Sequence, residues 1–157
     1  RIEEICELTG GERVLDVYCG TGGISLYLSR SAGTVLGVEA SAEAVKDATK
    51  NSAQNGVSNC GFMSGPAEDL LGQLCTQGEQ FDVAVTDPPR AGMHHRAIRS
   101  LIDLAPKRVV YVSCNPASLA TDVSILKAHG YRLNLLQLVD MLPQTPHCEV
   151  LARLDRE

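Results

Sequence analysis

Long apolar runs are missing from this chain, and none of its six cysteines belongs to a Cys-x-x-Cys pair. The apolar runs are far too short to span a bilayer, so we expect no membrane segment in this sequence. The cysteine spacing argues against a zinc or iron–sulfur site within the chain. Because the cysteines are scattered among apolar segments, they indicate reduced thiols in a cytoplasmic protein.

An excess of basic residues is also absent. The chain has 14 Lys and Arg against 19 Asp and Glu, which gives a net charge of −5. This balance argues against a broad electrostatic footprint for nucleic acid. A nucleic-acid substrate would therefore need a local basic face or help from another part of the protein. No signal-peptide pattern is present, and the sequence starts at Arg1, so we expect further sequence upstream.

The composition is that of an ordinary globular protein, with 44% hydrophobic and 21% charged residues. At 157 residues the chain is large enough to bury a substantial core. Repeats, linkers and low-complexity tracts are absent from it. We predict one domain over residues 1–157.

Strand-like and helix-like segments alternate along the chain. The predicted strands cover residues 13–18, 34–39, 59–63, 81–86, 109–112, 131–139 and 148–154. The predicted helices cover residues 2–8, 24–30, 41–55, 66–74, 94–104 and 118–129. Alternation predicts an α/β fold with a doubly wound parallel sheet. The last two strands have no helix between them, so they should form an antiparallel hairpin. By analogy, this is the Rossmann-like pattern of S-adenosylmethionine-dependent methyltransferases.

A glycine-rich loop follows the first long strand and opens a helix. It has the form Asp16-x-Tyr18-x-Gly20-x-Gly22. The glycines allow a tight turn and a close approach of backbone to a ligand. Glu39 ends the next strand, where a carboxylate can accept hydrogen bonds from both hydroxyls of a ribose.

The loop has two other interpretations, a plain structural turn and a nicotinamide dinucleotide site. The dinucleotide fingerprint requires a third small residue at a position held here by Ser25. A pyrophosphate also binds best at a helix N-terminus free of acids. Asp16 instead suits a cationic group, such as the amino group of a methionine moiety. The pattern therefore favours S-adenosylmethionine.

Asp87-Pro88-Pro89-Arg90 ends the fourth strand. The prolines restrict the backbone and remove amide donors, so the loop is rigid and the carboxylate is aimed. A plain strand-ending turn is the alternative. Methyltransferases that act on exocyclic amines have an aromatic residue where this chain has Arg90, so amine methylation is disfavoured.

The buried strand 109–112 is followed by Ser113, Cys114, Asn115 and Pro116. Asn-Pro ends the strand abruptly and places Cys114 at its carboxyl end. In open parallel sheets this is the edge where ligands bind. The alternative is that Cys114 is a small buried hydrophobic residue, as free cysteines often are.

Taken together, these motifs resemble the RNA (uracil-5-)-methyltransferase family over nearly the whole chain. The matching segments are Asp16–Gly22, Asp87–Gly92, Val109–Pro116 and Asp140–Glu149. Two departures are Leu142, where the family usually has an aromatic residue, and Cys148, where a larger apolar residue is common. Family members carry an upstream RNA-binding β-barrel, so the resemblance implies that this chain is the catalytic domain alone.

The resemblance also implies a chemistry. Cys114 would be the nucleophile that attacks C6 of uracil, and Glu149 the base that removes the proton from C5. The cofactor would be S-adenosyl-L-methionine, with Asp87, Tyr18 and Gly23 in cofactor-contact positions. The target uridine would have to leave its stack to reach the site.

The sequence leaves alternatives open for the substrate and for the roles of two side chains. Residues 113–122 look closest to the bacterial ribosomal RNA members, so ribosomal RNA is the first expectation and transfer RNA the second. A non-catalytic cofactor- or RNA-binding module is the competing class, which the presence of both Cys114 and Glu149 opposes. His147 either orients Glu149 or packs in its turn, and Arg90 either contacts a phosphate or steadies its loop.

Overall fold

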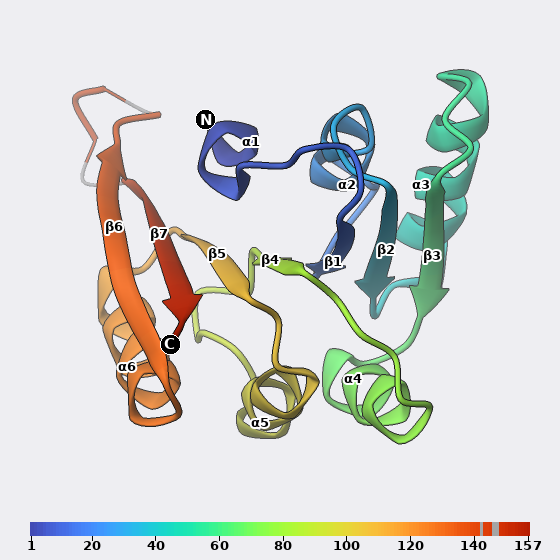
Figure 1. Ribbon diagram of the computed structural model, residues 1–157. Coiled ribbons are helices and arrows are strands. Elements are labelled where there is room, and N and C mark those ends of the chain that lie inside the picture. Colours follow the sequence, from blue (N-terminus) through green and yellow to red (C-terminus); the bar gives the residue numbers. More distant parts are fainter. Residues whose placement is uncertain (142, 146–147) are drawn as a thin grey trace.

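The computed structural model describes residues 1–141, 143–145 and 148–157. Within these residues, seven strands form one sheet in the order β3-β2-β1-β4-β5-β7-β6 (Figure 1). The strands are β1 (Arg13–Val17), β2 (Thr34–Glu39), β3 (Cys60–Ser64), β4 (Val83–Thr86), β5 (Arg108–Ser113), β6 (Tyr131–Val139) and β7 (Glu149–Arg156). The helices are α1 (Ile2–Cys6), α2 (Gly23–Leu28), α3 (Ala42–Gln54), α4 (Ala67–Thr76), α5 (His95–Leu104) and α6 (Pro116–Ala128).

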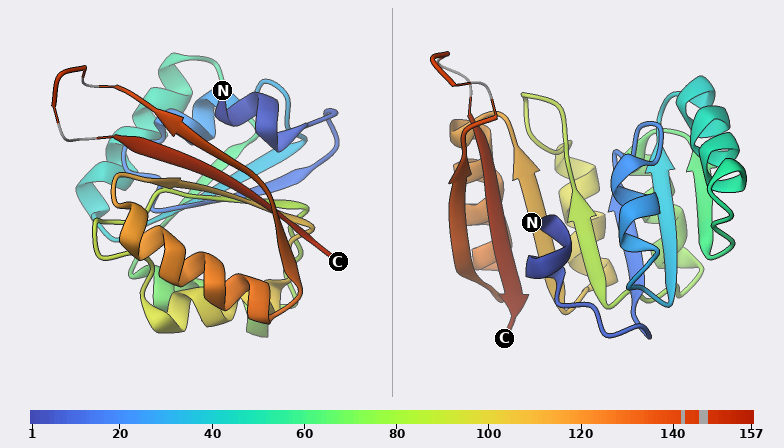
Figure 2. Two further views of the ribbon diagram at one scale, coloured as in Figure 1. Left: turned by 90° about the vertical axis from the view of Figure 1, so that its left-hand side faces the viewer. Right: turned by 90° about the horizontal axis from the view of Figure 1, so that it is seen from above.

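Strands β1 to β5 are parallel to one another, and β7 pairs antiparallel with both β5 and β6. Figure 2 shows the hairpin of β6 and β7 at one end of the sheet, beside β5. The predicted doubly wound sheet with an antiparallel hairpin is therefore confirmed. Each predicted helix and strand occurs, with bounds that differ from the prediction by at most two residues.

Helices cover both faces of the sheet, with α1 to α3 on one face and α4 to α6 on the other (Figure 1). All four residues of β4 are buried, as expected for a central strand covered on both faces. On α5 the buried residues are Ala97, Ile98, Leu101 and Leu104, which form one apolar face of a helix. They join the larger part of the core, beneath α4 to α6. This two-sided burial leaves the strand ends as the accessible part of the central strands.

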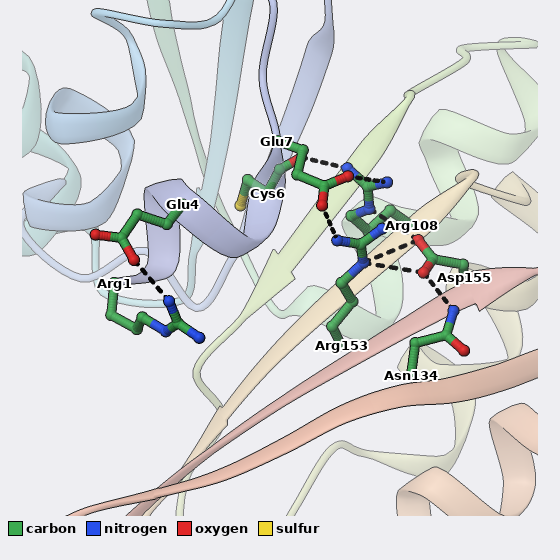
Figure 3. Close-up of polar contacts among 8 residues, drawn as sticks. All are labelled: Arg1, Glu4, Cys6, Glu7, Arg108, Asn134, Arg153 and Asp155. Atoms are coloured by element: carbon green, nitrogen blue, oxygen red, sulfur yellow. Dashed lines mark hydrogen bonds and ion pairs between the residues drawn. The ribbon is translucent and has the colours of Figure 1, made fainter.

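An ion-pair cluster holds α1 against β5 and β7 (Figure 3). Arg108 and Arg153 both contact Asp155, at 2.8 and 2.9 Å, and both contact Glu7, at 3.1 and 2.5 Å. Arg108 also donates a hydrogen bond to the carbonyl of Cys6. Burial alone would raise the pKa of Asp155, but hydrogen bonds from Arg108, Asn134 and Arg153 lower it overall. The cluster therefore joins the end of the first helix to strands β5 and β7.

Candidate active site

The carboxyl ends of β1, β2, β4 and β5 lie at one edge of the sheet because these strands are parallel. Strand β7 runs the opposite way, so its first residue, Glu149, lies at the same edge. The register pairs Ser113 with Val150. One step further, Cys114 and Glu149 are the next residues across these two neighbouring strands. The topology thus brings together two residues that are far apart in the sequence.

Asp87 joins this pair from the end of β4. Partial burial of its carboxyl group raises the pKa of Asp87, and the charge of Glu149 raises it further. Strands β4 and β5 are parallel neighbours, so their carboxyl ends lie side by side at this edge. Asp87, Cys114 and Glu149 therefore line the same part of the sheet edge.

Cys114 differs from the other cysteines in its surroundings. Of the cysteines that the structure describes, it alone is exposed. Burial raises the pKa of Cys6 and of Cys19 to about 12, so both stay protonated near neutral pH. The interpretation of Cys114 as a buried hydrophobic residue is wrong, since the strand ends before it and leaves it accessible.

Local hydrogen bonds fix the turn that carries Cys114. The Ser113 hydroxyl accepts from the backbone N–H of Asn115 and donates to its carbonyl, both at 3.0 Å. The Asn115 side chain then caps α6 by accepting from the N–H of Ala117 at 3.1 Å. Pro116 is the first residue of that helix, where its missing N–H costs nothing. Cys114 is thereby held between the end of a strand and the start of a helix.

The glycine loop has the backbone that its sequence predicts. Gly20 and Gly22 adopt φ values of +53° and +83°. A Cβ on Gly22 would lie 3.1 Å from both Ala48 and Phe62, so this glycine is required by space as well as by conformation. Tyr18, at φ +66°, is one of the few other residues in this region of backbone space.

Glu39 holds this loop in place. Its carboxylate accepts from the N–H of Gly20 at 3.1 Å and from the N–H of Ser41 at 2.8 Å. Each carboxylate oxygen has a further lone pair, so a ribose hydroxyl can still be accepted. The sequence predicted a ligand contact for Glu39, and the structure adds a role in shaping the loop.

Asp16 lies beneath the loop, with its residue fully buried. Ser25 donates a hydrogen bond to Oδ2 at 2.5 Å, whereas Oδ1 has no hydrogen-bond partner within the described part of the chain. Burial raises the pKa of Asp16 to about 7. A buried acceptor without a partner is costly unless something satisfies it, and a bound donor is one solution. The site therefore fits a ligand with a cationic or hydrogen-bonding group.

A pocket of about 430 Å³ lies beside α2, at the end of β5 and the start of β7. Gly23, Ile24, Val112, Glu149 and Leu151 are among the residues that line it. Gly23 and Glu149 are the predicted site residues that line this pocket; the others do not line it, namely Asp16, Tyr18, Gly20, Gly22, Glu39, Asp87 and Cys114.

Several contacts were not predicted from the sequence. The hydrogen bond from Ser25 to Asp16 and the link from Asn115 to the carbonyl of Arg90, at 2.9 Å, depend on tertiary packing. The side chain of Arg90 is exposed beside this link. The predicted alternatives for His147 lie outside the described residues, as does Leu142. Groups of three or more side chains suited to hold a metal do not occur in the described residues.

Comparison with known proteins identifies the family. The family model described as tRNA (Uracil-5-)-methyltransferase matches residues 2–157. The chain belongs to this family. The resemblance of its motifs to uracil-5 methyltransferases is thereby confirmed. Among the described residues of this family member, no helix is long and apolar enough to cross a membrane.

Relatives and solved structures agree with this assignment. An uncharacterized RNA methyltransferase of Enterococcus faecalis is 46% identical over 99% of this chain and 34% of its own length. The crystal structure of Pyrococcus abyssi tRNA (uracil-54, C5)-methyltransferase in complex with S-adenosyl-L-homocysteine is 34% identical, with a TM-score of 0.81 over 98% of this chain and 36% of that one. Precorrin-6y C5,15-methyltransferase from Geobacter metallireducens, at 14% identity and a TM-score of 0.82, shares the fold. This family member spans about a third of the length of the relatives it matches.

Proposed function

We propose that this chain is the catalytic domain of an enzyme that transfers a methyl group from S-adenosyl-L-methionine to C5 of a uridine in structured RNA. The observation that carries the proposal is the placement of Cys114 and Glu149 at neighbouring positions across β5 and β7, with Asp87 at the end of the neighbouring strand β4. Membership of the uracil-5 methyltransferase family supports it.

The cofactor would be held at the glycine loop. Gly20, Gly22 and Gly23 bring backbone close to the ligand, and Glu39 accepts from the ribose. The unpartnered Oδ1 of Asp16 suits the methionine amino group. Tyr18 and Asp87 complete the cofactor contacts. When bound, S-adenosyl-L-methionine supplies an electrophilic methyl group. A related structure contains S-adenosyl-L-homocysteine, the product that this transfer leaves.

Cys114 supplies the nucleophile that uracil C5 needs. Its thiolate forms a bond to C6, and the electrons of the C5–C6 double bond move to O4, giving an enolate. Carbon 5 is then electron-rich and would form its bond to the methyl group as the C4–O4 carbonyl re-forms and the bond between the methyl and the cofactor sulfur breaks, which would leave S-adenosyl-L-homocysteine. Splitting one difficult substitution into two easier steps is the advantage of covalent catalysis.

Glu149 completes the reaction. After methylation C5 carries both a methyl group and a hydrogen. The carboxylate of Glu149 takes this proton, the C5–C6 double bond re-forms, and the bond between sulfur and C6 breaks to release the Cys114 thiolate. Both groups therefore return to their starting states once Glu149 loses its proton.

Ribosomal RNA is the proposed target, on the pattern of residues 113–122. Transfer RNA is the second candidate, supported by the Pyrococcus abyssi enzyme and by the description of the family model. Because the chain spans about a third of its relatives, we also propose that RNA binding uses an upstream region of the same cytoplasmic protein. A basic RNA-binding surface there would offset the repulsion between RNA phosphates and this chain, whose net charge is −5.

A direct test uses the full-length protein, S-adenosyl-L-methionine and ribosomal or transfer RNA that contains 5-fluorouridine. Fluorine cannot leave C5 as a proton does, so the reaction should stop as a covalent complex. Intact mass spectrometry should find protein, RNA and one methyl group together, and Cys114→Ala should abolish this species. A protein that binds cofactor and RNA without forming the adduct would instead be a binding module or act on another atom.

A further inference from the structure

Asp122, on helix α6, is a buried carboxylate that the chemistry above leaves without a role. Its Oδ2 atom accepts two hydrogen bonds, from the backbone N–H of Met93 at 2.8 Å and from the hydroxyl of Tyr111 at 2.5 Å. Burying a carboxylate is costly unless such bonds compensate for lost hydration. Its position therefore needs an explanation.

Three parts of the candidate site meet at Asp122. Helix α6 begins directly after the turn that carries Cys114, and Tyr111 lies on β5, which leads into that turn. Met93 belongs to the loop that starts at Asp87. Gly92, at φ +86°, brings this loop so close that a Cβ there would lie 2.9 Å from Oδ2 of Asp122.

Two other contacts hold the same loop, residues 87–94. Asn115 donates from its side chain to the carbonyl of Arg90 at 2.9 Å. The backbone N–H of Asp87 donates to the carbonyl of Val17, at the start of the glycine loop, at 3.3 Å. The loop is thus connected to the Cys114 turn and to the glycine loop, and Asp122 forms its buried attachment.

We propose that Asp122 is a positioning residue, which fixes the loop of Asp87 relative to Cys114 through Met93 and Tyr111. This inference rests on the proposed function, because it concerns the relative placement of two groups of that site. Reacting groups held in place avoid an entropic cost, and a displacement of about 1 Å can slow a reaction by about 100-fold.

The test compares Asp122→Ala with Asp122→Asn in the full-length protein. The amide oxygen of Asn can occupy the place of Oδ2 and accept both hydrogen bonds, whereas Ala removes the acceptor. At saturating cofactor and RNA, Asp122→Ala should lower the single-turnover rate constant by about 10- to 100-fold. Asp122→Asn should restore it, and Asp103→Ala, an exposed change on α5, should leave it unchanged.

Further readouts separate positioning from folding. A loss of folded protein lowers the amplitude of a single turnover and leaves its rate constant unchanged. In Asp122→Ala, alkylation of Cys114 by iodoacetamide should stay as fast as in the wild type. If Asp122→Ala does not fold, Gly92→Ala displaces the loop from Oδ2 and should slow the reaction similarly. A wild-type rate constant in whichever of these two variants folds overturns the proposal.

The proposed function can fail separately. If the wild-type protein makes no 5-methyluridine and no fluorouridine adduct, the reaction assigned above is wrong. Hydrogen exchange of the Met93 amide then tests whether Asp122 attaches the loop of residues 87–94. Faster exchange in Asp122→Ala than in Asp103→Ala supports the attachment, and equal exchange overturns it.

Discussion

Ser25 donates a hydrogen bond of 2.5 Å to one carboxylate oxygen of Asp16, and both residues are fully buried. The bond favours the charged form of Asp16, but burial has the larger effect and raises its pKa to about 7. Above that pH the folded protein carries a buried carboxylate beneath the glycine loop. The cost of this charge is a measurable property of the site.

The pH dependence of stability should reveal that cost. In the unfolded chain Asp16 ionises near 3.8, whereas in the folded protein it stays protonated up to about 7. Folding therefore loses stability from this group as the pH rises between these values. As the pH rises through this range, the free energy of unfolding of Asp16→Asn should increase by about 2–4 kcal/mol relative to that of the wild type. Urea unfolding at several pH values measures this change. The control is Asp47→Asn, at an exposed position, whose free energy of unfolding should differ from that of the wild type by the same amount at every pH.

Glu39→Ala should weaken binding of S-adenosyl-L-homocysteine. The substitution removes the acceptor of the Gly20 and Ser41 amides as well as the predicted acceptor of the ribose. We expect a loss of about 1–3 kcal/mol, measured by calorimetry. Glu43→Ala, on the exposed first turn of α3, is the matched control. An unchanged affinity for Glu39→Ala would place the ribose site elsewhere.

Glu149→Gln should stop the reaction after methyl transfer. Gln cannot take the proton from C5, so ordinary uridine RNA should accumulate as a methylated covalent complex, and turnover should fall by about 100- to 10,000-fold. Denaturing electrophoresis and mass spectrometry detect the complex, with Glu43→Gln as control. Free 5-methyluridine formed at the wild-type rate would contradict the assignment of Glu149 as the base.

Asp155→Ala should destabilise the fold by about 1–3 kcal/mol, because it leaves Arg108 and Arg153 largely buried with fewer partners. The pKa of Asp155 is lowered in the folded protein, so its contribution is present above its unfolded pKa of 3.8. The contribution is lost as the pH falls through the lowered pKa.

The matched control is Asp69→Ala, which breaks an exposed ion pair with Arg96. Exposed pairs contribute about 0–1 kcal/mol, so its effect on denaturant unfolding should be small. Equal effects of the two substitutions would show that the cluster around Asp155 does not stabilise α1 against the sheet.

The sequence predicts much of this fold because its signals are local. Apolar strands, the Ser41 cap and the Asn115-Pro116 boundary act over a few residues, so the elements follow from them. The short connection after Val139 likewise predicts the hairpin. These signals place Asp16, Glu39, Asp87 and Cys114 at strand ends.

The rest depends on distances that no local pattern encodes. The approach of Asp122 to Met93 and the burial of Ser25 against Asp16 arise only when helices pack on the sheet. The nearness of Glu149 to Cys114 was expected only from a family resemblance. It depends on the order of the strands in the sheet, which local sequence patterns do not encode. The exposed edge is predictable, and the contacts that support it are not.

Strand β7 lies between β5 and β6, although it follows both in the chain. During synthesis on the ribosome, β5 is therefore made with one side unpaired, and β6 cannot cover it in its final place. Pairing is complete only when β7 inserts between them, a non-local step of the kind that folds slowly. The nucleophile and the base of the proposed reaction thus meet in the same event that closes the sheet, so a nascent chain gains its proposed chemistry only when its fold is complete.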